Sequence, residues 1–324
     1  MTVATHTLVL ALAPFSEAAL LVGPLAARRS VFPEESITLA SSPGVCEVVR
    51  ALGLANQVVP VPTLANVSKA PAGVFGNLSL LSRVRGAKFD TVVDLFPGIP
   101  SGLAALVAAG NRGVSDPGVY AEALLASRKS SRRLADPLLR LSQLLGVGSS
   151  PDRLDVVPGA EADAWVEKAL QSTGYRGGGP VLTVHFSGSW TLTQMVDVAS
   201  ELRSQFDAWV IALDTPGEGS EARHVAGALG GRVLGVGSPS GERFIAALVR
   251  SSLVLTDDPG VANLAALARV RTVLVRIGLD LHSPVHQDFA VCSGLTADAV
   301  RTDAVRDAAS ILLAKSRTSS LFSE

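Results

Sequence analysis

The chain has 324 residues, of which 48% are hydrophobic and 18% are charged, and its formal net charge is -1 at pH 7. This length fits two domains rather than one core, and so apolar a composition excludes an intrinsically disordered chain. The near-neutral charge and the 5% content of aromatic residues argue against a general nucleic-acid-binding surface, so no nucleic-acid partner is expected.

The apolar stretch 8–27 is the first candidate element in the chain. Pro14, Glu17 and Pro24 interrupt it, and a carboxylate near the middle of a membrane span is costly. The residues before it, 1–6, contain no Lys or Arg, which argues against a signal peptide. We therefore expect a buried strand followed by a helix at this place.

Short β-branched runs alternate with longer helical patterns along the rest of the chain. In the first half we expect strands at 8–13, 37–40, 58–61 and 91–96, with helices at 17–28, 44–52 and 98–109. In the second half we expect strands at 181–185, 209–214, 232–236, 253–256 and 272–277, with helices at 195–205, 218–229, 241–250 and 260–268. Such alternation predicts parallel sheets that helices cover on both faces.

A polar segment at 146–158, a helix pattern at 161–172 and a glycine run just before 181 separate the two halves. The predicted fold is α/β, with two Rossmann-like, doubly wound domains facing a cleft. They span 1–160 and 175–305, and a C-terminal helix and tail follow at 306–324. The chain has no GxGxxG fingerprint after its first strand and no Walker P-loop, so a standard dehydrogenase or kinase is not expected.

The segment 253–275 carries the clearest local signal for a binding site. A hydrophobic strand ends at Thr256, a polar Asp-Asp-Pro-Gly turn follows, and a helix of small residues begins. Backbone N–H groups at a helix N-terminus attract anions, and Gly260 lets a ligand approach the backbone closely. Asp258 could accept hydrogen bonds from sugar or ribose hydroxyls; alternatively, Asp257 or Asp258 only caps the helix.

Several segments are similar to the motifs of one enzyme family. TDDPGVANLAA at 256–266 is similar to that family's TNDSGPMHLAA, FDTVVDLFPG at 89–98 to its YDLVIDLQG, and IALDTPGE at 211–218 to its LLGGPGE. HFSGSW at 185–190 resembles a shortened form of the motif that runs from HPG to KRW. Over residues 7–315 the chain thus resembles a divergent member of glycosyltransferase family 9, the ADP-heptose:lipopolysaccharide heptosyltransferase family.

The resemblance implies a bacterial, inverting glycosyltransferase of the GT-B fold that needs no metal and no cofactor. It would move a heptose-like sugar from a nucleotide-sugar, expected to be ADP-heptose, to a lipopolysaccharide-core or other glycan acceptor. The donor-binding residues that it implies are Ser187, Glu218, Asp258, Gly260 and Asn263. The acceptor-binding residues that it implies are Asp94 and the basic cluster Arg128, Lys129, Arg132 and Arg133.

Glu17 is the catalytic residue that the resemblance implies. The family carries a general-base aspartate in the loop after its first strand, and Glu17 takes that position. A carboxylate there could deprotonate the acceptor hydroxyl while its oxygen attacks the anomeric carbon. Each of these residues also has a structural alternative: Glu17 favours a helix N-terminus, Asp94 caps a strand end or is a buried hydrogen-bonded carboxylate, and the basic cluster is a solvated loop.

Three positions depart from the family pattern. Gly188 replaces a lysine that contacts the donor diphosphate, and residues 180–202 contain no lysine at all. Ser16 replaces a glycine and Asn263 replaces a histidine. A glycosyltransferase with a changed donor or acceptor is the preferred interpretation. The main alternative is a catalytically inactive GT-B-fold protein that acts as a binding or scaffold partner in envelope glycan assembly, and a two-domain sugar-nucleotide epimerase is less favoured because no histidine-rich site is evident.

The expected cellular localisation follows from the cysteines and from the acceptor that the resemblance implies. Cys46 and Cys292 show no metal-binding spacing and fit a reduced compartment, so a cytoplasmic protein is expected. A lipid-linked glycan acceptor would place it peripherally at the inner membrane. The resemblance also implies that the last helix, at 303–316, packs back on the first domain.

Overall fold

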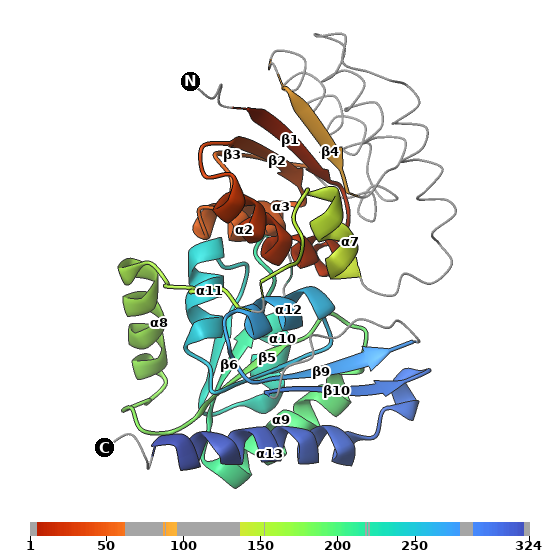
Figure 1. Cartoon of the computed structure of the whole chain (residues 1–324). Coiled ribbons are helices and arrows are strands. Elements are labelled where there is room, and N and C mark those ends of the chain that lie inside the picture. Colours follow the sequence, from red (N-terminus) through yellow and green to blue (C-terminus); the bar gives the residue numbers. More distant parts are fainter. Residues whose placement is uncertain are drawn as a thin grey trace, which may run out of the picture. The chain divides into compact units, whose positions relative to one another are not determined.

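The computed structural model describes residues 5–61, 87, 89–95, 137–151, 153–217, 219, 221–278 and 288–320, with the backbone alone at 137–140 and 315–320. The chain divides into two compact units, Met1–Pro151 and Asp152–Glu324. Each unit is built on a parallel sheet of its own, as the ribbon shows (Figure 1). The predicted pair of doubly wound α/β domains is thereby confirmed.

The sheet of the first unit has the strand order β3-β2-β1-β4, and all of its described pairings are parallel. Its strands are β1 (His6–Ala11), β2 (Ser36–Ser41), β3 (Gln57–Pro60) and β4 (Thr91–Asp94). β1 and β2 are buried over five of their six residues, as expected for central strands that helices cover on both faces. The order reverses between β1 and β4, so the carboxyl ends of these two strands form the switch point of the sheet.

Helices of the first unit follow the predicted order with one local difference. Its described helices are α1 (Phe15–Ala18), the 3-10 turn η1 (Ala19–Leu21), α2 (Val22–Val31), α3 (Pro43–Ala51) and α7 (Pro137–Leu144). The single helix predicted at 17–28 is thus two helices joined by a 3-10 turn, and Pro24 lies in the first turn of α2, where a missing N–H costs little. The predicted helix at 98–109 lies outside the described residues.

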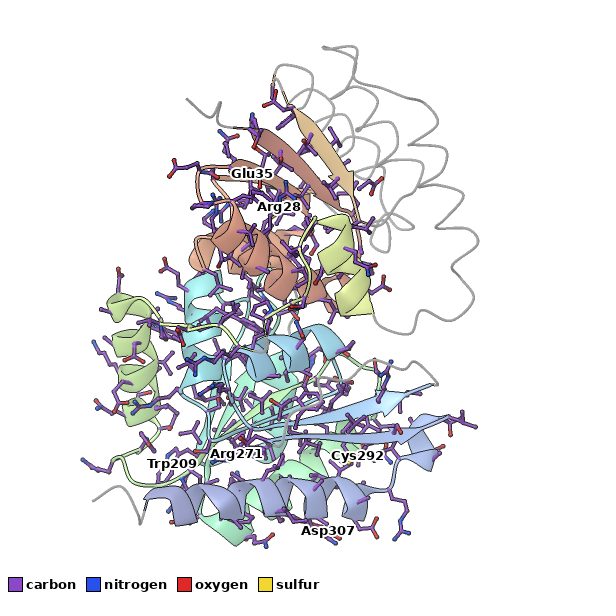
Figure 2. The ribbon with its side chains drawn as sticks, viewed as in Figure 1. Arg28, Glu35, Trp209, Arg271, Cys292 and Asp307 are labelled. Carbon is purple, nitrogen blue, oxygen red and sulfur yellow. The ribbon has the colours of Figure 1, made fainter. Side chains whose placement is uncertain are left out.

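A buried ion pair holds the amino-terminal side of this sheet (Figure 2). Arg28 on α2 donates to Glu35 from Nε at 2.7 Å and from Nη2 at 2.5 Å, and Thr7 also donates to Glu35. A third guanidinium nitrogen donates to the Leu145 carbonyl after α7. Burial alone would raise the pKa of Glu35, but the hydrogen bonds from Arg28 and Thr7 and the charges of Arg28 and Arg29 outweigh it, so this pKa lies below its ordinary value of 4.5.

The sheet of the second unit has the order β10-β9-β8-β5-β6-β7, again with parallel pairings. Its strands are β5 (Val181–His185), β6 (Trp209–Leu213), β7 (Val233–Val236), β8 (Leu253–Thr256), β9 (Thr272–Ile277) and β10 (Phe289–Gly294). Counted within the unit, the order is 3-2-1-4-5-6, which is the dinucleotide-binding arrangement of a doubly wound sheet. Its switch point lies between β5 and β8.

Helices cover both faces of this second sheet. They are α8 (Ala160–Ser172), α9 (Leu192–Phe206), α10 (Glu221–Leu229), α11 (Gly241–Val249), α12 (Pro259–Leu267), the 3-10 turn η3 (Ala297–Ala299) and α13 (Thr302–Ser320). One core joins α9, α10 and α13 to side chains of the central strands, while α11 and α12 lie on the opposite face (Figure 1). α8 packs on α11, where Arg250 pairs with Glu167 and the Arg243 guanidinium lies 4.4 Å from the Trp165 ring.

The C-terminal helix packs on its own unit. Val305, Ala309, Leu312 and Leu313 of α13 belong to the core of the second unit, while the predicted contact of this helix with the first domain stays a prediction. The helix follows β10 after the short turn η3, and its apolar stripe packs on the neighbouring strands β8, β9 and β10. Within the described residues, no helix is both long and apolar enough to cross a membrane.

Candidate functional site

The switch point of the second unit gathers the polar residues that the sequence placed in one motif. β5 and β8 are hydrogen-bonded neighbours, and His185 at the end of β5 lies in register with Thr256 at the end of β8. The turns that follow these two strands therefore begin side by side. In open parallel sheets this is the place where ligands bind.

The Asp257 side chain joins the two turns. Its Oδ1 accepts the backbone N–H of Ser187 at 2.6 Å, and its Oδ2 accepts those of Ser189 at 2.7 Å and Trp190 at 2.9 Å. Gly188 sits inside this loop with φ of +92°, a conformation that L residues rarely adopt. The carboxylate is buried, and it fixes the loop between β5 and α9 as a cradle of three amides, which we call the 187–190 loop.

Asp258 caps α12. Its Oδ1 accepts the Val261 N–H at 2.9 Å, and its own N–H donates to Thr256 Oγ1 at 3.0 Å. Burial raises the pKa of Asp258, and the neighbouring Asp257 raises it further, although His185 and the amides at the start of α12 act in the opposite direction. The capping alternative considered for this residue is thus what the structure shows, while its contact with a donor stays a prediction.

His185 connects three strand ends. Its Nδ1 lies 3.0 Å from Oγ1 of Thr256, the last residue of β8, and its Nε2 lies 3.0 Å from Oγ1 of Thr215, which follows β6. The ring is buried, so both nitrogens are satisfied by protein groups rather than by solvent. His185 therefore has a structural role in holding the edge together, and no sequence pattern distinguished it from the other histidines.

Three buried polar atoms at this edge lack a partner within the described part of the chain. They are Nε1 of Trp190, in the 187–190 loop, Nδ2 of Asn263, on α12, and Oδ2 of Asp214, which follows β6. The other oxygen of Asp214 accepts the Ala222 N–H at the start of α10 at 2.6 Å. An unpaired buried polar group costs on the order of 1–3 kcal/mol, so such atoms mark places where a ligand or water can add a hydrogen bond.

The other predicted donor-binding residues differ from one another in their exposure. Ser187 is exposed, with its hydroxyl 3.3 Å from that of Ser189, and Gly260 is buried in the first turn of α12. Glu218 lies outside the described residues. From the sequence, Asp257 was considered only as a possible helix cap. Its role in the 187–190 loop was missed because its three partners lie 67–70 residues away in the chain.

The first unit places Glu17 and Asp94 at its own switch point. Glu17 lies on α1, just after β1, and its backbone N–H donates to the Pro14 carbonyl at 3.1 Å. Its side chain is exposed, and no described residue hydrogen-bonds its carboxylate. Asp94 ends β4, in register with Leu10 of β1, and is half-buried.

The remaining predicted acceptor residues, Arg128, Lys129, Arg132 and Arg133, lie outside the described residues. Among the described side chains, no group of three or more His, Cys, Asp or Glu is arranged to hold a metal ion. Arg276 is a further residue that sequence reasoning missed. It is the penultimate residue of β9 and therefore lies at the carboxyl edge, one strand from β8.

Comparisons with known proteins find similarity at the level of structure. No family model and no curated protein matches the sequence. The glycosyl transferase of family 9 from Veillonella parvula has a TM-score of 0.72 at 14% identity, covering 96% of this chain and 97% of that one. E. coli ADP-heptose lipopolysaccharide heptosyltransferase II has a TM-score of 0.65 at 13% identity, with 97% and 100% covered. E. coli heptosyltransferase WaaC, solved with ADP, has a TM-score of 0.64 at 14% identity, with 95% and 100% covered.

These matches extend over nearly the whole of each chain, so both units and their order along the sequence are shared. At identities this low, the likeness establishes the fold. The fold predicted from the sequence, that of two-domain glycosyltransferases, is confirmed.

Proposed function

We propose that the chain is a glycosyltransferase of the heptosyltransferase kind, which takes its nucleotide-sugar donor on the second unit and carries its general base on the first. The observation that carries the proposal is the likeness of fold over almost the whole length of three such enzymes, one of them solved with ADP. The site chemistry agrees with it, because polar side chains gather at the carboxyl edge of each sheet.

On the second unit, the donor nucleotide would lie against the turns after β5 and β8. Asn263 offers an amide donor that no described residue uses, and the exposed Ser187 hydroxyl offers a second group to the same ligand. Asp258 caps α12 and Gly260 lies in its first turn, and the N-terminal amides of this helix favour negative charge. Arg276 supplies positive charge to this edge, which a diphosphate leaving group needs.

On the first unit, Glu17 would act as the base. Its carboxylate takes the proton of the acceptor hydroxyl while the acceptor oxygen forms a bond to the anomeric carbon. The bond from that carbon to the phosphate oxygen breaks, and the nucleoside diphosphate leaves with the electron pair. One displacement from the opposite face inverts the anomeric centre and requires no metal ion or cofactor.

The proposed donor is ADP-heptose and the proposed acceptor is a lipopolysaccharide-core glycan. A lipid-linked acceptor would bring a cytoplasmic enzyme to the inner membrane surface. Asp94 and the basic cluster Arg128, Lys129, Arg132 and Arg133 would hold the acceptor, since guanidinium groups suit phosphate and carboxylate.

One observation favours a second candidate function. Gly188 stands where a donor-binding lysine is expected, and Asp257 already accepts the three amide protons of the 187–190 loop. Fewer groups are then left to stabilise a departing diphosphate. The alternative is a protein of the same fold that binds a glycan or nucleotide without catalysis.

A transfer assay decides between these functions. The chain is incubated with ADP-heptose and a heptose-free lipopolysaccharide core, and both ADP release and the acceptor mass are followed. We expect acceptor-dependent release, reduced by Arg276→Ala but kept by Arg271→Ala, a control at the residue just before the same strand. Nucleotide binding without transfer to any acceptor, from ADP-, UDP- or GDP-linked sugars, would favour the non-catalytic alternative.

A further inference from the structure

The 187–190 loop occupies the place where a doubly wound sheet usually holds phosphate. It follows the first strand of its unit and leads into α9, which begins at Leu192 after the capping residue Thr191. Phosphate groups bind at such loops because several backbone N–H groups converge on one point. In this protein three amides converge, and the anion they hold is the side chain of Asp257.

We propose that Asp257 is a specificity-determining residue, whose carboxylate fills the amide cradle of Ser187, Ser189 and Trp190 as a permanent internal anion. The second unit then accepts ligands whose phosphate groups lie away from this loop. For the identity of the ligand, this inference rests on the proposed function. It adds that the 187–190 loop does not contact the phosphate groups of the donor.

Geometry explains why the carboxylate stays in place. Both oxygens are used, at 2.6–2.9 Å, and hydrogen bonds to a charged acceptor are about twice as strong as those between neutral groups. The backbone of Asp257 is held on both sides, by Thr256 in the β8 pairing and by Asp258 at the cap of α12. Moving the side chain out would leave three amides of the loop without their acceptor.

Charge at the edge acts in the same direction. A phosphate group approaching the 187–190 loop would meet the carboxylates of Asp257 and Asp258 and no lysine between residues 180 and 202. Like charges at short range repel strongly where water is excluded. What the loop does offer is a pair of exposed hydroxyls, Ser187 and Ser189, with oxygens 3.3 Å apart, which suit a neutral hydroxyl-bearing group.

The test measures pyrophosphate binding by the full chain with amide NMR spectra. In the wild type, we expect the signals of Ser187, Ser189 and Trp190 to stay unmoved as pyrophosphate is added. In Asp257→Ala, the three amides lose their acceptor, and we expect pyrophosphate to bind at least about tenfold more tightly and to move these signals. Asp197→Ala, which removes an exposed carboxylate from α9, is the matched charge control and should behave as the wild type.

Two results would overturn the proposal: movement of the three signals in the wild type, or a folded Asp257→Ala chain that binds pyrophosphate no better than Asp197→Ala. If Asp257→Ala does not fold, Asp257→Asn replaces it, because the asparagine amide keeps one oxygen acceptor but loses the charge. Asp257→Asn should bind pyrophosphate more tightly than the wild type. Failure to do so counts against the proposal. A chain that binds no nucleotide-sugar would refute the proposed function, whereas the pyrophosphate comparison would still report on Asp257.

Discussion

The carboxyl edges of the two sheets are built in opposite ways. In the second unit, Asp257 accepts three amides, Asp258 caps a helix and His185 contacts two threonines, and all three side chains are buried. In the first unit, Glu17 is exposed and no described residue hydrogen-bonds its carboxylate. The contrast indicates that the second edge is organised before any ligand arrives, while the first keeps a carboxylate available to accept a proton.

The two units also differ in where they are held rigid. The first unit places its buried ion pair, Arg28 with Glu35, on the amino side of its sheet, far along the strands from Glu17. The second unit places its buried carboxylates at the carboxyl edge itself. Substitutions at the first edge should therefore change chemistry with little effect on stability, and substitutions at the second edge should change both.

The largest expected effect comes from Glu17→Gln. Removing the base should lower the transfer rate by about 10²–10⁴-fold, because general-base catalysis contributes on that order. Unfolding in urea should stay the same, since the side chain is exposed. Glu34→Gln, at another exposed glutamate of this unit, is the control, and unchanged transfer in Glu17→Gln would remove Glu17 from the mechanism.

Arg28→Ala should produce the largest loss of stability. It leaves the Glu35 carboxylate buried without its main partner, and breaking a buried pair costs about 3 kcal/mol or more. Arg50→Ala breaks an exposed pair with Glu47 and should cost about 0.5 kcal/mol or less. Urea denaturation of the two variants measures the difference, and equal losses would show that the Arg28 pair is not a stabilising feature of the first unit.

Asp258→Ala should combine two smaller effects. Loss of the cap should cost about 1 kcal/mol of stability, and donor affinity should fall by about tenfold, or roughly 1.4 kcal/mol. Asp258→Ser keeps a capping oxygen and separates the two effects, while Ser240→Ala removes the cap of α11 and serves as the control for capping alone. Nucleotide-sugar affinity that is unchanged in Asp258→Ala would mean that the donor binds elsewhere.

The smallest effect is a difference in pH dependence between the units. The pKa of Glu35 is lowered, so its contribution to stability is present above its unfolded value, near 4.5, and is lost as the pH falls through the lower folded value. The pKa of Asp258 is raised, so ionisation of this carboxyl opposes folding. The protonated form contributes stability at low pH, and that contribution is lost as the pH rises from the unfolded pKa of about 3.8 towards the higher folded pKa.

Urea denaturation between pH 3 and pH 7 should therefore separate two neutral variants. The difference in unfolding free energy between the wild type and Glu35→Gln should narrow as the pH falls. The unfolding free energy of Asp258→Asn should increase relative to that of the wild type as the pH rises towards 7. Parallel curves for the wild type and both variants would contradict the assigned pKa directions.

Alternating strands and helices were readable from the sequence because each is a local pattern. The strands at 181–185, 253–256 and 272–277 have the bounds that were predicted. β10 was missed; it is an edge strand, and its residues are half-buried or exposed. The break of the first helix at η1 was missed because the apolar positions continue through it.

The site was predicted less completely, for a physical reason. Asp258 stood out because a strand, a turn and a helix surround it in sequence. The role of Asp257 depends on β5 lying next to β8, and such a pairing of distant segments is set by the sheet as a whole. His185 and the unpaired atom of Asp214 are of the same kind, because burial and neighbouring strands give them their meaning.

The central claim, that the second unit binds a nucleotide-sugar, is tested most directly by calorimetric titration of the full chain with ADP, UDP and GDP, followed by ADP-heptose. We expect selective binding of ADP and of ADP-heptose, with both weakened in Asp258→Ala. No binding to any nucleotide or nucleotide-sugar would contradict it, and the chain would then be a protein that keeps the glycosyltransferase fold without a donor site.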